Sequence, residues 1–115
     1  MRFLMTYNSK AGPPSPEKNA AIEKFVEEMF KSGMLVDTGG ILPTAARVKM
    51  EGGKFTATDG PFPETKELIV GYAIVSVKTK EEAIELSRRF MALAGEGDGE
   101  IRQLVGPADG PPPPQ

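Results

Sequence analysis

The feature that most constrains the fold of this chain is a run of mostly apolar residues between Leu68 and Val77. The run, LIVGYAIVSV, is apolar at nearly every position rather than at every second one. This pattern is typical of a strand that is buried on both faces and lies in the middle of a sheet. The rest of the chain must therefore provide a cover for both faces of that sheet.

Two segments have the spacing of amphipathic helices, with apolar residues three and four positions apart. The first is expected between Ser15, an N-cap that a proline follows, and Gly33. Its apolar stripe comprises Ile22, Phe25, Val26, Met29 and Phe30. The second is expected between Thr79 and Gly95, where Thr79 and Glu82 form a capping box in which each side chain bonds the other's backbone amide. Its stripe comprises Ala83, Leu86, Phe90 and Leu93.

Shorter segments complete the secondary structure. Further strands are expected over residues 2–7, 34–38 and 101–105. Loops are expected over residues 8–14 and 96–99, and a turn at Gly39-Gly40. Residues 46–57 have the pattern of a β-hairpin around Gly52-Gly53, because a primed turn needs residues that accept positive φ. Alternation of apolar and charged residues in this hairpin predicts one solvated face.

The order strand, helix, strand, hairpin, strand, helix, strand predicts an α+β fold of the ferredoxin-like split β-α-β kind with a β-hairpin insert. Both helices would then cover the same face of an antiparallel sheet. Because the central strand is apolar on both sides, the other face needs a second copy, and two copies would form a homodimeric α/β barrel. A monomer with one partly apolar, ligand-lined face is the alternative.

Composition sets the remaining limits. The 115 residues, 39% apolar and 26% charged, predict one domain over residues 1–105 and a proline-rich tail over 106–115 that stays solvated. A net charge of −2 without a basic stripe argues against nucleic acid. No apolar run reaches the ~20 residues of a membrane span, so we expect a cytoplasmic protein. The chain has no histidine or cysteine, so we expect no metal site. The sequence also indicates no cofactor.

The most specific motif is the string TDGPFPETKE over residues 58–67, which leads directly into the central strand. Together with MTY at 5–7, TGG at 38–40 and GY at 71–72, it resembles the DGPF-domain family within the YCII-related group, over about residues 2–105. The resemblance implies a ferredoxin-like fold assembled as a dimeric α/β barrel. The YCII-like branch is associated with a histidine–aspartate pair, and the histidine half has no counterpart here.

The turn at Asp59 has both a structural and a functional interpretation. Asp59, Gly60 and Pro61 can form a rigid turn that directs the chain into the central strand. The same turn could hold the Asp59 carboxylate at the mouth of a pocket, as a base or as an anchor for a polar ligand. Asp59 is therefore the candidate catalytic residue. The candidate ligand-binding residues are Tyr7, Arg47, Asp59, Gly60, Pro61, Lys66 and Glu67.

Three functions remain open at this stage. The first is a small-molecule-binding homodimer with a cleft between sheet and hairpin, near the turn that contains Asp59. The second is an enzyme of the dimeric α/β-barrel type that uses Asp59 without histidine. The third is a regulatory module that binds a protein partner through the barrel surface or through the proline-rich tail.

Overall fold

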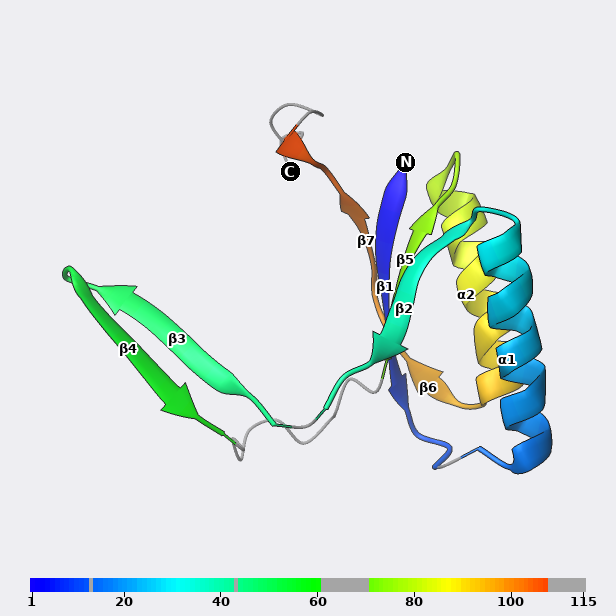
Figure 1. Cartoon of the computed structure of the whole chain (residues 1–115), viewed down its shortest axis with the longest axis horizontal. Helices are drawn as coiled ribbons and strands as arrows, with labels where there is room; N and C mark the ends of the chain where they lie inside the picture. The colour runs from blue at the N-terminus through cyan, green and yellow to red at the C-terminus, as the bar shows by residue number, and fades with distance from the viewer. Residues whose placement is uncertain (13, 43, 61–70, 108–115) are drawn as a thin grey trace.

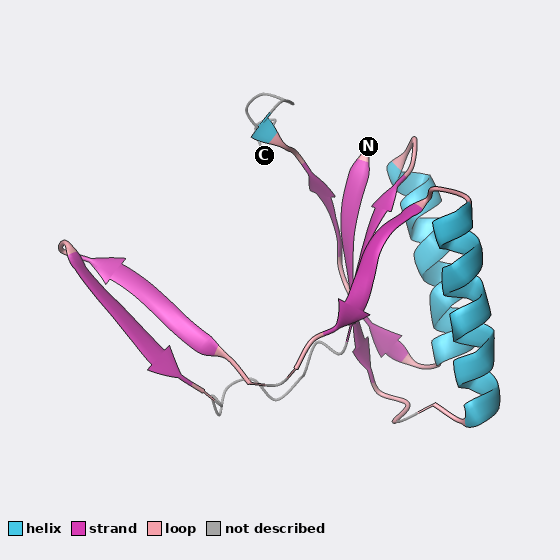
Figure 2. Cartoon of the chain, viewed as in Figure 1, coloured by secondary structure: helices cyan, strands magenta, loops and turns pink. Residues whose placement is uncertain are grey.

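The computed structural model describes residues 1–12, 14–42, 44–60 and 71–107. Two helices, seven strands and the turns between them account for most of this part of the chain (Figures 1 and 2). The elements in order are β1 (Arg2–Ser9), α1 (Pro16–Lys31), β2 (Leu35–Gly40), β3 (Ala46–Glu51), β4 (Lys54–Asp59), β5 (Gly71–Ser76), α2 (Lys80–Ala94), β6 (Gly97–Asp98) and β7 (Ile101–Leu104).

The main sheet is antiparallel, with β5 between β2 and β1 and with β7 on the far side of β1. Both helices lie on one face of this sheet (Figure 1). The arrangement is the ferredoxin-like split β-α-β fold, so the predicted α+β class is confirmed. The described part of the apolar run is the central strand β5, as its pattern indicates. A single chain forms an open sheet rather than a closed barrel.

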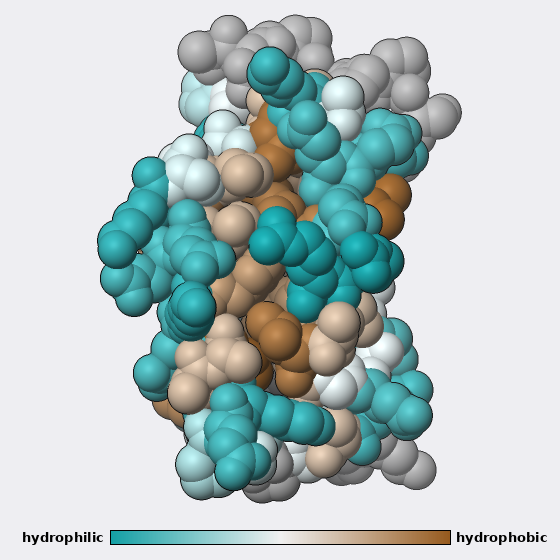
Figure 3. All heavy atoms as spheres, turned by 90° about the vertical axis from the view of Figure 1, so that its right-hand side faces the viewer, coloured by the Kyte–Doolittle hydropathy of each residue, from teal (hydrophilic) through white to brown (hydrophobic). Residues whose placement is uncertain are grey.

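The core lies between the sheet and the two helices. Phe3 on β1 and Val75 on β5 face each other across the strand pair and are 1% and 2% exposed. The other buried apolar residues are Met29, Leu35, Val77, Ala83 and Leu86. Viewed from the helix side, the surface is mostly hydrophilic, and apolar side chains gather along the line between the helices (Figure 3).

Both helices begin where the sequence predicts. The Ser15 hydroxyl accepts a hydrogen bond from the backbone N–H of Lys18, and the Thr79 hydroxyl accepts one from that of Glu82. The reciprocal half of the predicted capping box differs, because the Glu82 carboxylate accepts from the backbone N–H of Lys78 rather than that of Thr79. The Glu82 side chain thus satisfies the backbone N–H of the residue that precedes the N-cap Thr79. Among the described helices, none is long and apolar enough to span a membrane.

Parts of two predicted loops, and the predicted turn at Gly39-Gly40, belong to strands. Strand β1 continues through Asn8 and Ser9, which pair with Asp98 and Gly97 of β6. The pair Gly39-Gly40, expected as a turn, ends β2 as regular strand opposite Tyr72 and Gly71. The tyrosine ring fills the space above Gly39, where an added Cβ would lie 3.1 Å from the ring. These polar or glycine-rich segments are strands because they pair with a neighbouring strand. Local sequence does not reveal that pairing.

The β3–β4 hairpin extends away from the main sheet (Figure 1). Its turn residues Gly52 and Gly53 have φ of 58° and 77°, as the sequence predicts for a primed turn. Every residue of both strands is exposed. The radius of gyration is 16.6 Å, whereas a compact chain of this length has about 13 Å, so the hairpin makes the molecule elongated.

Candidate functional site

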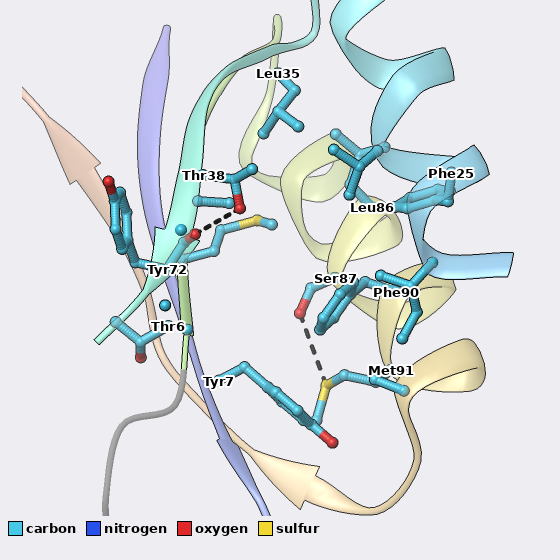
Figure 4. Close-up of a pocket in the computed structure, with 18 of the residues that line it drawn as sticks. Thr6, Tyr7, Phe25, Leu35, Thr38, Tyr72, Leu86, Ser87, Phe90 and Met91 are labelled. Carbon is cyan, nitrogen blue, oxygen red and sulfur yellow. Dashed lines mark hydrogen bonds between the residues drawn. The ribbon is translucent and has the colours of Figure 1, made fainter. Parts of the chain in front are cut away.

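A cleft of about 720 Å³ opens between the helices and the sheet (Figure 4). Strands β1, β2 and β5 form one wall, and α1 and α2 form the other. Its lining includes the large side chains of Met5, Tyr7, Phe25, Met29, Leu86, Phe90 and Met91. A concave, mostly apolar space of this size with a few polar groups is typical of a small-molecule site.

Period-two alternation in the strands positions the sheet side of the cleft. Met5 and Tyr7 follow the buried Phe3 at two-residue intervals on β1, and all three therefore face the helices. On α2, Phe90 and Met91 follow the buried Leu86 by four and five positions, on the face that packs on the sheet. The cleft therefore continues the core, in the region where the side chains of the helices and those of the sheet no longer fill the space between them.

Tyr7 is the central polar residue of the cleft. Its hydroxyl donates a hydrogen bond shared between the carbonyl oxygens of Gly95 at 3.0 Å and Glu96 at 3.2 Å. Its ring stands edge-on to that of Phe90, with centroids 5.3 Å apart and an interplanar angle of 85°. The phenol therefore fixes the C-terminal end of α2 to β1, and the ring contributes an aromatic wall (Figure 4).

The other hydroxyls of the cleft also have partners within the chain. The Ser87 hydroxyl lies 3.8 Å from the sulfur of Met91, and the Thr38 hydroxyl donates to the carbonyl oxygen of Tyr72 at 2.8 Å (Figure 4). The described lining residues include no aspartate, glutamate, lysine or arginine. Among the described residues, no group of three or more acidic or cysteine side chains is placed to hold a metal ion. The cleft is therefore suited to an uncharged molecule.

A second polar feature lies on the opposite face of the sheet. The Tyr72 ring points away from the helices (Figure 4), and its hydroxyl donates to Oδ2 of Asp37 at 3.1 Å. The other oxygen of Asp37 accepts from the backbone N–H of Thr38 at 2.9 Å. The hydrogen bond and the negative charge of Asp37 raise the pKa of Tyr72 above its ordinary value. The Tyr72 hydroxyl therefore serves as a hydrogen-bond donor on this face of the sheet.

The residues predicted as a site do not all meet at this cleft. Tyr7 lines it. Arg47 and Asp59 belong to the hairpin strands and Gly60 follows them, so none of the three is part of the cleft lining. The Asp59 side chain is exposed. Pro61, Lys66 and Glu67 lie outside the described residues, so the predicted set as a whole stays a prediction. The cleft lies between sheet and helices rather than between sheet and hairpin.

Sequence reasoning missed the helix side of the cleft. Phe25, Phe90 and Met91 have the spacing of a buried stripe, and that pattern does not distinguish a filled core from a hollow one. The contact between Asp37 and Tyr72 was also missed, because the two residues are far apart in sequence and meet only through the pairing of β2 with β5.

Comparison with known proteins adds three findings. Residues 1–104 match the family described as "YCII-related domain". An uncharacterised protein of Rhizobium meliloti (strain 1021) is 32% identical over 90 residues, which are 76% of this chain and 69% of that protein. A solved structure of 5-chloro-2-hydroxyhydroquinone dehydrochlorinase (TftG) from Burkholderia phenoliruptrix AC1100, in complex with 2,5-dihydroxybenzoquinone, has a TM-score of 0.58 and 14% sequence identity. That match covers 91% of this chain and 94% of the other, and it shows a shared fold.

Proposed function

This chain belongs to the YCII-related family, and from that premise we propose that it is a small-molecule-binding homodimer whose ligand occupies the cleft between the helices and the sheet. The observation that carries the proposal is the cleft itself, about 720 Å³ with apolar and aromatic walls. The structural neighbour is described in complex with a ring compound, 2,5-dihydroxybenzoquinone, which supports a ligand of similar size.

The ligand class follows from the cleft walls. Aromatic rings of Tyr7, Phe25 and Phe90 favour a planar, ring-containing molecule, which stacks or packs edge-on against them. A charged group would lose its hydration without gaining an opposite charge from the described lining, which is costly. The ligand is therefore an uncharged aromatic or alicyclic compound whose polar groups remain near the cleft mouth.

Dimerisation has a separate basis, the uncovered face of the sheet. Leu4 on β1 and Ile74 on β5 form a register pair on the face away from the helices, and both are only partly buried. In Figure 1 no helix lies on that side. A second copy can cover these two side chains, and in a twofold pair each copy covers the same face of the other. The other two functions, an enzyme using Asp59 and a protein-interaction module, stay predictions.

A thermal-shift experiment with two matched probes tests the ligand proposal. The uncharged 2-naphthol is expected to raise the melting temperature, whereas 2-naphthoate, a carboxylate of nearly the same shape, is expected to leave it unchanged. At a probe concentration of 100 times Kd, binding adds about 2.7 kcal/mol, which corresponds to roughly 10 °C for a chain of this length.

Two variants on the same helix locate the binding. Ala94 lines the cleft, whereas Ala92 is exposed and outside it. Ala94→Phe should fill the space and abolish the shift with 2-naphthol, and Ala92→Phe should retain it. An equal shift with both naphthalene probes, or a shift that survives Ala94→Phe, would contradict the proposal.

A further inference from the structure

The β3–β4 hairpin has one apolar face without a partner. In its register Met50 lies opposite Phe55 and Val48 lies opposite Ala57, so these four side chains share one face. Val48 and Met50 are each 67% exposed and Phe55 is 60% exposed. Three large apolar side chains thus stand in water on an element that extends from the body of the molecule.

The opposite face of the hairpin is suited to solvent. It consists of Arg47, Lys49, Glu51, Lys54, Thr56 and Thr58. Lys49 and Glu51 form an ion pair at 2.9 Å on this face. A two-stranded hairpin with one solvated and one apolar face is at best marginally stable alone, and it becomes stable when the apolar face packs on another element. The hairpin therefore has the chemistry of a docking arm.

The exposed surface of the chain indicates what covers the arm. The hairpin extends away from the main sheet of its own chain, so its apolar face does not pack on that sheet (Figure 1). The face of the main sheet that the helices leave open has its own apolar side chains, which are only partly buried. In a pair of chains each copy offers both surfaces, so one arm and one sheet face can cover each other twice.

We propose that the apolar face of the β3–β4 hairpin packs on the open face of the main sheet of a second copy of this chain. The open face presents Leu4 and Ile74, away from the helices. In a twofold-symmetric pair each sheet is covered by the arm of the other copy, so one contact type is made twice. Asp59, which pairs with Ala46, lies on the same face as Phe55 at the base of the arm, so docking brings it toward the partner, whereas Arg47 lies on the opposite face.

This proposal rests on the homodimer of the proposed function, and sedimentation velocity at a series of concentrations separates the two. The test compares Phe55→Lys on the apolar face with Thr56→Lys on the polar face. We expect the wild type and Thr56→Lys to be dimeric, and Phe55→Lys to weaken dimerisation about a hundredfold, roughly tenfold for each of the two arms. If Phe55→Lys stays dimeric, docking through the hairpin is refuted and the homodimer proposal is retained. If the wild type is monomeric, both proposals are refuted.

Photo-crosslinking identifies the surface that the arm contacts. The chain has no cysteine, so Phe55→Cys can carry a single benzophenone-maleimide, with Thr56→Cys as the control. Labelled protein is mixed with ¹⁵N-labelled wild type, and crosslinked peptides are identified by mass spectrometry. Mixed-isotope crosslinks from position 55 to β1 or β5 would support the proposal. Crosslinks within one chain, crosslinks to the helices, none at all, or an equal pattern from position 56 would overturn it.

Discussion

Tyr7→Phe separates a structural role of the tyrosine hydroxyl from a role in ligand binding. The hydroxyl donates to the carbonyl oxygens of Gly95 and Glu96, at the end of α2. Phenylalanine keeps the ring against Phe90 and leaves no cavity, so the change removes only this shared, partly buried hydrogen bond. One neutral bond contributes about 1 kcal/mol, which lowers the melting temperature by roughly 4 °C.

Urea unfolding followed by circular dichroism measures the loss of stability, and titration with 2-naphthol measures affinity for the cleft. We expect affinity to change by less than about twofold, because the Tyr7 hydroxyl faces the two carbonyls and only its ring forms the wall. The control is Tyr72→Phe, whose hydroxyl bonds an exposed carboxylate and whose loss should cost less. A tenfold loss of affinity by Tyr7→Phe at unchanged stability would refute this reasoning, since the hydroxyl would then contact the ligand.

Three further changes test the fold. The raised pKa of Tyr72 implies that its hydrogen bond to Asp37 stabilises the fold fully below pH 10, and that this stabilisation is lost as the pH rises through the pKa of the folded state. In a Tyr7→Phe background, phenolate absorbance at 295 nm should therefore appear at higher pH in the folded than in the unfolded chain. Asp37→Asn should reduce this difference in pH. Gly99→Ala places a Cβ in collision with the backbone carbonyl oxygen of Thr6, so it should destabilise the chain by about 3 kcal/mol in urea unfolding, and an unchanged midpoint would show that the loop moves freely. Phe3→Ala removes the largest fully buried side chain of the described residues and should cost about 3–5 kcal/mol; a loss below 1 kcal/mol would place the core elsewhere.

Much of the fold follows from local pattern. The Ser15 and Thr79 caps mark where the helices begin, and the apolar run before Val77 indicates the central strand. Period and capping are local properties, so one sequence is enough to find them. Gly39 was misassigned for the opposite reason, because its place in β2 depends on Tyr72 in a distant strand. Local sequence does not show which polar segments a neighbouring strand recruits.

The candidate site was less predictable than the fold. Tyr7 was expected at a pocket and lines the cleft. Phe25 and Phe90, which form much of the opposite wall, have the same pattern as core residues because the cleft is an unfilled part of the core. Asp59 was grouped with Tyr7 through a motif, yet the hairpin that ends at Asp59 extends away from the sheet. A motif indicates which residues matter and does not say which surface they share.

The uncharged lining of the cleft has a consequence for how occupancy would be controlled. Tyrosine is the only acidic or basic side-chain type among its described lining residues, and tyrosine is neutral at pH 7. Changes in acidity or ionic strength within the physiological range would then leave the fraction of occupied protein almost unaltered. The fraction of protein with ligand bound would then depend on the free concentration of the ligand and hardly on the pH or salt of the solution.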